Sequence, residues 1–146
     1  MIRRNLPDLN VLIALTDSGH DHHHKARNWF SSSGKENWGL CPLTEAGFIR
    51  VTANPAMHEG ARRMEQSIAI LQALKGLPGH LYWEIKASWV DLTARFAPRI
   101  SGHQQVTDAY LLGLAIENDG VLVTFDRGLR YMAGPEFSSR NLLVLE

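Results

Sequence analysis

The stretch VTDAYLLGLAIENDGVLVTFD, residues 106–126, determines the fold that we expect. It begins as a helix that carries an acid, Asp108, in its first turn. This helix should end at residues 118–120, where the glycine can take the left-handed conformation that stops a helix. The apolar run 121–123 that follows is typical of a strand buried in a parallel sheet. The pattern therefore predicts a layered α/β fold.

Two acids are expected at the carboxyl ends of strands. Thr124 and Asp126 follow the strand just described, and Asp8 follows a short strand over residues 4–7. The helix after Asp8 should begin with Asn10 as its cap, so that strand, acid and helix form the first half of a βαβ unit. Ligands of open α/β sheets bind beyond the carboxyl ends of the strands, where these acids should lie. The alternative for Asp8 is a helix-capping aspartate.

Further elements are expected from short apolar segments and from helical periodicity. The expected strands are residues 38–41, 81–83 and 142–145, and the expected helices are residues 43–53, 56–75 and 87–96. An acid, Glu45, lies one turn into an otherwise apolar helix, where an unpaired carboxylate is costly unless a cation or a donor meets it. The alternative is an exposed first-turn glutamate that the helix dipole favours.

Composition sets broad limits. The 146 residues match the size of one domain, 1–146, and 15 Lys and Arg balance 15 Asp and Glu, so overall charge gives no argument for binding a polyanion. The lone Cys41 excludes an internal disulfide and fits a reducing, cytoplasmic location. We find no signal peptide and no apolar run of membrane-spanning length, so no membrane partner is expected.

A histidine-rich segment, HDHHH, precedes the helix that contains Trp29. Imidazole and carboxylate groups together could bind zinc or nickel. Only His20 and His24 have the spacing that stacks two ligands on one helical face, and they lie at the helix start. We therefore favour a solvated helix start over a metal site.

Four acids, Asp8, Glu45, Asp108 and Asp126, can converge at one edge of such a sheet. Carboxylates packed together repel each other by about 4 kcal/mol per pair at about 4 Å, with an effective dielectric constant of about 20, so the cluster should need a cation. Oxygen ligands of this kind select Mg²⁺ or Mn²⁺. Such ions bind phosphodiesters and activate water.

The motifs DLNVLIAL, PLTEAGFIRV, GHQQVTDAYLLGLA and VTFDRGL together resemble a PIN-domain ribonuclease of the VapC toxin type. The resemblance implies a three-layer α/β fold whose short, mostly parallel central sheet of about four or five strands is flanked by helices. It also implies that the four acids surround Mg²⁺ or Mn²⁺, and that Asn10 and Thr124 support them by hydrogen bonding. We expect Asp8 and Asp126 to be direct ligands, with Glu45 and Asp108 acting through water.

The resemblance further implies hydrolysis of RNA, of tRNA or rRNA for example, a cognate VapB-type antitoxin and a toxin homodimer. Unlike many PIN domains, the chain has no further acid shortly after Asp108, so a second metal would have few protein ligands. Arg50, Arg127 and Arg130 could hold flanking phosphates or could simply be solvated. The alternative function is a catalytically silent PIN-like module that binds RNA or protein.

Overall fold

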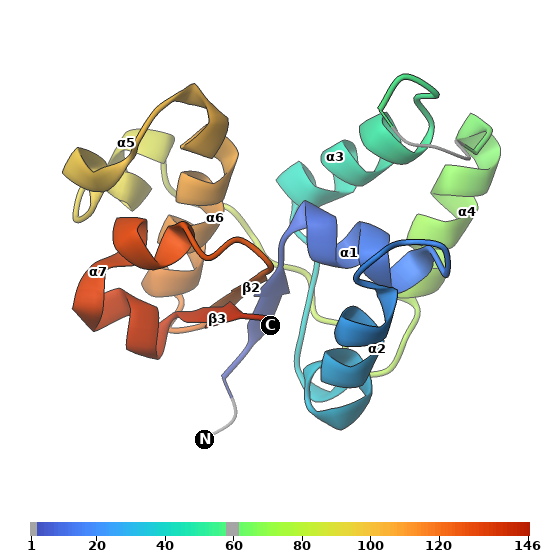
Figure 1. Cartoon of the computed structure of the whole chain (residues 1–146), viewed down its shortest axis with the longest axis horizontal. Helices are drawn as coiled ribbons and strands as arrows, with labels where there is room; N and C mark the ends of the chain where they lie inside the picture. Colours follow the sequence, from blue (N-terminus) through green and yellow to red (C-terminus); the bar gives the residue numbers. More distant parts are fainter. Residues whose placement is uncertain (1–2, 58–61) are drawn as a thin grey trace.

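The computed structural model describes residues 3–57 and 62–146, and its centre is a small parallel sheet (Figure 1). Strands β1 (Asn5–Pro7), β2 (Val121–Thr124) and β3 (Leu142–Val144) lie in the order β1-β2-β3. Leu6 is in register with Leu122, and Val123 with Leu143. The expected α/β fold class, a parallel sheet between helices, is confirmed.

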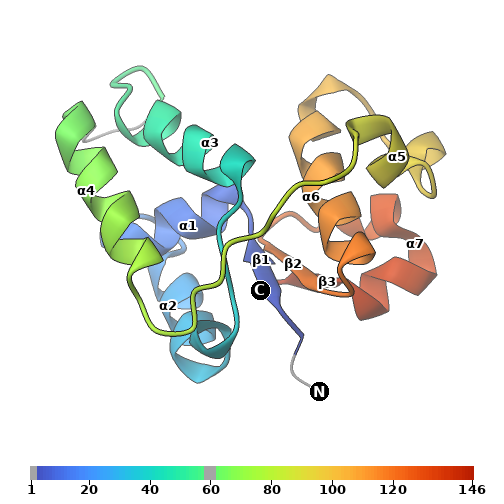
Figure 2. The ribbon, with the colours of Figure 1, turned by 180° about the vertical axis from the view of Figure 1, so that it is seen from behind.

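The sheet has three regular strands, fewer than the expected four or five. Segment 38–41 is extended and runs beside β1, and segment 81–83 runs beside segment 38–41, but only isolated bridges, Asn5 to Trp38 and Trp38 to His80, join them (Figure 2). Hydrogen bonds from Gly39 N to Asn5 O (3.1 Å) and from Leu81 N to Trp38 O (2.8 Å) hold them. A Cβ at Gly39 would lie 1.8 Å from the Leu81 carbonyl oxygen, so this close approach needs glycine.

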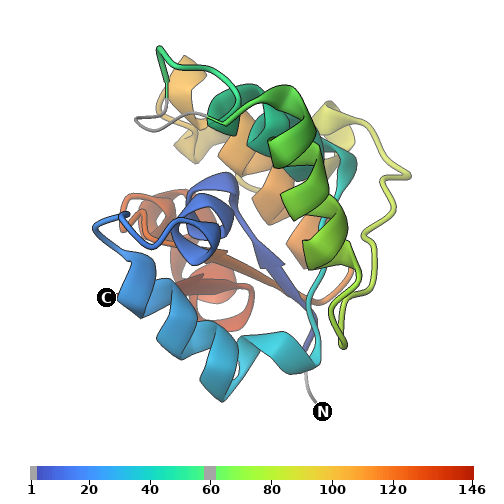
Figure 3. The same ribbon diagram turned by 90° about the vertical axis from the view of Figure 1, so that its right-hand side faces the viewer.

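Helices cover both faces of the sheet (Figures 1 and 3). On one side lie α1 (Leu9–Thr16), α2 (His23–Ser32), α3 (Pro42–Thr52) and α4 (Met64–Lys75), and on the other lie α5 (Trp89–Thr93), α6 (Val106–Glu117) and α7 (Leu129–Arg140). Short 3₁₀ turns are η1 (Gly34–Glu36), η2 (Ala97–Arg99) and η3 (His103–Gln105). No helix in the described ranges has both the length and the apolar character needed to span a bilayer.

The core is divided by the alternation of side chains along β2. Leu122 is fully buried in the cluster that includes residues of α6 and α7. Val123 points to the opposite face and packs with Val11 of α1 and Trp29 of α2. Because successive strand residues face opposite sides, a four-residue strand can anchor both helical layers.

Several element boundaries differ from the expected ones. Helix α1 is capped by Asp8, not Asn10, because the Asp8 carboxylate already accepts a first-turn N–H. Helix α4 begins at Met64 rather than near residue 56, and residues 58–61 of that expected helix lie outside the described ranges. Helix α5 is also shorter than the 87–96 predicted.

The turn after α6 has its left-handed residue at Asp119 (φ 51°), not at the glycine as expected. The N–H groups of Asp119 and Gly120 donate to Ile116 O (3.1 Å) and Ala115 O (2.7 Å), which closes the helix end. Gly120 is needed for space, because a Cβ there would lie 2.4 Å from the Trp83 ring. The turn lies in the predicted place, but Asp119 rather than Gly120 takes the left-handed conformation.

Candidate active site

Asp8 follows β1 directly, and its side chain is buried, with only 4% of the residue's surface exposed. Its Oδ1 accepts from the backbone N–H of Val11 (3.0 Å), and its Oδ2 accepts from the Thr124 hydroxyl (2.6 Å). Burial raises the pKa of Asp8 to about 6 despite these hydrogen bonds, and Asp126 raises it further. Asp8 is thus both a helix cap and a fixed, buried acid.

Thr124 connects the ends of β1 and β2. While its hydroxyl donates to Asp8, the same oxygen accepts from the backbone N–H of Asp126 (3.1 Å). The Asp126 Oδ1 in turn accepts from the N–H of Gly128 (2.8 Å), so the carboxylate has a fixed orientation although the residue is exposed. The carboxyl ends of two adjacent strands therefore present two oriented acids.

Asp108 lies in the first turn of α6, within electrostatic reach of both of these acids. Burial raises the pKa of Asp108 to about 7, with further contributions from the negative charges of Asp8 and then Asp126. In the described part of the chain, no hydrogen bond to its carboxylate offsets this burial. The structure therefore brings together three of the four expected acids.

The Glu45 carboxylate contacts Lys75 and Tyr82 rather than the three aspartates. Its Oε2 lies 2.8 Å from Lys75 Nζ of α4, and its Oε1 accepts from the Tyr82 hydroxyl (3.0 Å). Burial, and then the bond to Glu45, raise the pKa of Tyr82 to about 12. Glu45 does not contribute to the raised pKa of Asp8 or of Asp108. Lys75 is the cation and Tyr82 the donor that a half-buried glutamate needs. A role of Glu45 at the acidic edge stays a prediction.

No side-chain bond to the three aspartates is found, in the described ranges, for the other residues predicted at the site. Asn10 is exposed on α1, and its backbone N–H rather than its amide contributes to Asp8. Arg127 Nε and Arg130 Nη2 lie 3.4 and 3.1 Å from Glu146 Oε1, so these two arginines are already paired. Arg50 is exposed on α3.

The donor chemistry at this edge fits a hard divalent cation. In residues 3–57 and 62–146, no three His, Cys, Asp or Glu side chains are close enough to form a complete metal cage as they stand. However, all three aspartates offer oxygen, and a cation would relieve the unfavourable burial of Asp8 and Asp108. Because Mg²⁺ retains several water ligands, it does not require all its protein ligands in direct contact.

The histidine-rich segment is held by hydrogen bonds within the fold. His23 donates from Nδ1 to the carbonyl oxygen of Ala14 (2.7 Å), and His20 Nδ1 accepts from the backbone N–H of His22 (3.0 Å). No metal cage includes these histidines in the described ranges. Sequence reasoning missed that the His20 and His22 rings contact Phe125, beside Asp126.

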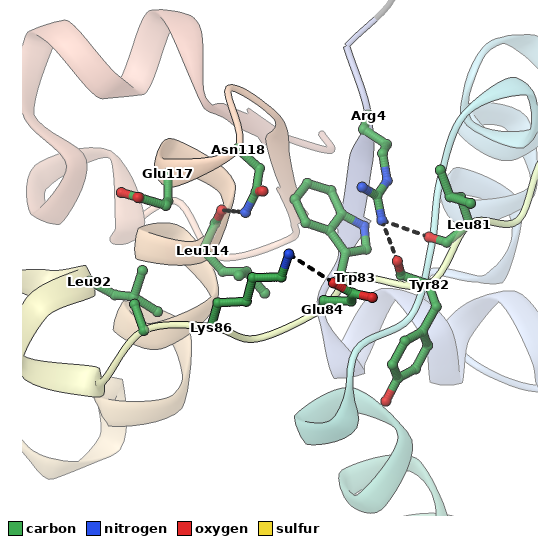
Figure 4. Close-up of a pocket in the computed structure, with 11 residues that line it drawn as sticks. Arg4, Leu81, Tyr82, Trp83, Glu84, Lys86, Leu92, Leu114, Glu117 and Asn118 are labelled. Carbon is green, nitrogen blue, oxygen red and sulfur yellow. Dashed lines mark hydrogen bonds and ion pairs between the residues drawn. The ribbon is translucent and has the colours of Figure 1, made fainter.

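A separate pocket lies toward the opposite, amino-terminal edge of the sheet (Figure 4). The Arg4 guanidinium lies over the Trp83 ring, 4.2 Å from its centroid, and donates to the carbonyl oxygens of Leu81 (2.9 Å) and Tyr82 (2.7 Å). None of the four predicted acids lines this pocket. It is therefore distinct from the acidic edge.

The chain is similar to known proteins of one family along most of its length. The model of the PIN domain family matches residues 6–135. Ribonuclease VapC38 of Mycobacterium tuberculosis is 41% identical over 128 residues, covering 88% of this chain and 89% of that protein. Ribonuclease VapC44 of the same species is 34% identical over 142 residues, covering 97% and 99%.

Solved structures share the fold at low sequence identity. VapBC2 from Rickettsia felis, bound to a DNA fragment from its promoter, matches with a TM-score of 0.62 at 11% identity over 97% of this chain and 98% of that chain. FitAcB from Neisseria gonorrhoeae matches with a TM-score of 0.64 at 15% identity over 95% and 96%. With its family match and its near full-length relatives, the chain belongs to the PIN-domain family, among the ribonucleases named VapC.

Proposed function

We propose that the protein is a metal-dependent endoribonuclease that acts as the toxin of a toxin–antitoxin pair. The observation that carries the proposal is the set of three mutually interacting aspartates at the carboxyl edge of the sheet. Relatives named ribonucleases, which match almost the whole chain, support the activity. A catalytically silent module is not favoured, because it would leave the buried Asp8 and the partly buried Asp108 with raised pKa values and no role.

Mg²⁺ or Mn²⁺ is the proposed cofactor, with Asp8 and Asp126 as its direct ligands. When bound, such an ion lowers the pKa of water and stabilises the leaving oxygen of a phosphodiester. The Thr124 hydroxyl and the Val11 N–H hold the Asp8 carboxylate in one orientation. The Gly128 N–H does the same for Asp126, so both ligands are oriented before RNA or metal arrives.

Asp108 is the proposed acceptor of the proton from the attacking water. It is the member of the trio whose carboxylate, in the described ranges, has no hydrogen-bond donor, so its oxygens are free to accept a hydrogen bond from water. Asp8 suits this role less well, because both of its oxygens already accept hydrogen bonds.

Glu45 is proposed to support the site rather than to bind metal directly. If its carboxylate acts at the acidic edge, Glu45→Gln should abolish cleavage while Lys75→Gln, which frees that carboxylate, should preserve it. If Glu45 only joins α3 to α4 through Lys75, both variants should lose a similar, small amount of stability and keep cleavage. Paired measurements of melting temperature and RNA cleavage distinguish these roles.

A cognate VapB-type antitoxin is the proposed inhibitor, in line with the VapBC assembly that shares this fold. A guanidinium from that partner would form charge-assisted hydrogen bonds with the aspartates and replace the cation. Inhibition should then be competitive with Mg²⁺. A homodimer is also proposed, because apolar side chains such as Val90 (68% exposed) and Tyr131 (69% exposed) are available to anchor an interface.

Brief induction in cells, followed by sequencing of newly formed RNA ends, tests the proposal. We expect growth arrest and new ends in a few tRNA or rRNA positions, and we expect both to disappear with Asp126→Asn or with the co-expressed antitoxin. Growth arrest that persists unchanged in Asp126→Asn would contradict the proposed nuclease. Unchanged RNA ends during arrest by the wild-type protein would contradict the proposed substrate.

A further inference from the structure

We propose that His20, His22 and Phe125 form a stacking subsite that binds an unpaired RNA base beside the three aspartates. We call these three residues the aromatic platform. The inference rests on the proposed ribonuclease function and adds to it a contact for the substrate. It also gives a role to the histidine-rich segment, for which the described residues provide no metal cage.

The aromatic platform joins two segments that are far apart in the sequence. The His22 and Phe125 ring centroids are 4.8 Å apart, with 36° between the ring planes. The His20 and Phe125 rings are closer to parallel, at 20° and 6.5 Å, and the two histidine rings are 5.8 Å apart. These separations lie within the range of favourable aromatic contacts, so the three rings form one cluster.

The position of Phe125 links the platform to the acids. Phe125 lies between Thr124, which donates to Asp8, and Asp126, whose carboxylate is oriented by Gly128. The Phe125 ring packs on the same face as Val123, toward α1, whose amino-terminal cap is Asp8. A nucleotide that adjoins a phosphate at the aspartates would reach the platform along this face. The base of that nucleotide is the part of RNA that can lie against an aromatic ring.

The platform is ordered but remains accessible. The backbone N–H of His22 donates to His20 Nδ1, and His23 is bonded to Ala14, so two hydrogen bonds hold the start of α2 in place. His22 is exposed, whereas His20 and Phe125 are partly buried. The His22 ring makes no hydrogen bond within the described ranges. A base could therefore stack without first displacing an internal contact.

Charge supplies little affinity for RNA at this edge, which favours stacking as the source of binding. Three acids lie there, and the nearby Arg127 and Arg130 are both paired with Glu146. The whole chain carries no net charge with neutral histidines. Stacking on aromatic side chains tolerates any base and commonly changes affinity by roughly tenfold or more per base.

The test compares His22→Ala with His24→Ala and His22→Phe. His24 is a matched control, because it is also exposed at the start of α2 and its ring contacts His23 rather than Phe125. The probe is a short, fluorescent, single-stranded RNA of random sequence. Binding is measured by anisotropy in EDTA, and the KM for cleavage is measured with Mg²⁺.

We expect His22→Ala to bind the probe roughly tenfold more weakly and to have a correspondingly higher KM. His24→Ala and His22→Phe should stay near wild type, because the first leaves the platform intact and the second keeps a ring on it. His22→Ala that equals His24→Ala in both measurements, or His22→Phe as weak as His22→Ala, would overturn the stacking subsite. A wild-type protein that neither binds nor cleaves RNA would refute the proposed function itself.

Discussion

Replacing Asp108 with asparagine should stabilise the metal-free protein at alkaline pH. Burial and two neighbouring acids raise the pKa of Asp108 from 3.8 to about 7, so ionising it costs more in the folded protein than in the unfolded chain. That difference corresponds to about 4 kcal/mol at a pH above both values. Asparagine also loses water on burial, and the carboxylate is partly accessible, so we expect a gain of about 1–2 kcal/mol.

Thermal unfolding in EDTA at pH 8, followed by circular dichroism, measures this gain. It should appear as a rise of roughly 3–6 °C in the melting temperature for a chain of this size. Asp126→Asn is the matched control, because Asp126 is exposed and its charge is only a minor cause of the raised pKa values of Asp8 and Asp108, so its melting temperature should rise less than that of Asp108→Asn. Equal melting temperatures for the two variants would refute the proposed strain at Asp108.

The stabilisation by Asp108→Asn should depend on pH and on Mg²⁺. The folded protein keeps protons on Asp8 and Asp108 that the unfolded chain releases near pH 4. The contribution of these two acids to wild-type stability should therefore be fully present below about pH 4 and be lost as the pH rises through about 6 to 7, and the advantage of Asp108→Asn should vanish at the acidic end. Mg²⁺ should stabilise the wild type by roughly 2.7 kcal/mol at about a hundred times its Kd, and the variant less.

Two further substitutions test the surroundings of the site. Thr124→Val should lower the free energy of unfolding by about 1–3 kcal/mol in urea titrations, because a buried Asp8 oxygen loses its donor. The loss of that hydrogen bond should also raise the pKa of Asp8 further and move the acidic limb of the pH profile for RNA cleavage upward. Gly120→Ala should lower the melting temperature, because the new Cβ would lie 2.4 Å from the Trp83 ring, whereas Gly102→Ala, with no atom within 4 Å, should be tolerated.

The sequence predicts the stretch from α6 to β2 well because its signals are local. The turn after α6 and the apolar run of β2 each depend on neighbouring residues, and they place Thr124 and Asp126 at a strand end. The same logic places Asp8 at the end of β1. Since carboxyl ends of parallel strands share one edge, the meeting of Asp8 and Thr124 follows from the topology.

Helix α7 was not among the expected elements, because its sequence breaks the helical period. Gly134 has φ 76° and is followed by Pro135, so the helix is kinked in its middle. Carbonyl groups near this kink are bonded from a distant side chain, with Arg99 donating to Met132 O (2.9 Å) and Ala133 O (3.1 Å). A local sequence pattern cannot show that a distant side chain bonds the carbonyl groups at a kink.

Contacts between distant segments account for the remaining differences at the site. The pairing of Glu45 with Lys75 joins residues 30 positions apart, and neither side chain has a local signal for the other. The ring contact of His22 with Phe125 joins an early segment of the chain to a late one. Residue types and strand ends could therefore predict which acids are available, whereas the partner of each side chain required the tertiary structure.

RNA cleavage across a Mg²⁺ titration tests the role of the three aspartates most directly. The initial rate on a labelled RNA is compared for wild type, Asp108→Asn and Asp126→Asn, with EDTA as the zero point. We expect cleavage by the wild type only with metal, and a loss of roughly 10²–10⁴-fold in Asp108→Asn, the size typical for removal of a general base. Wild-type cleavage that persists in EDTA, or undiminished rates in both variants, would contradict a metal-dependent site built from these acids.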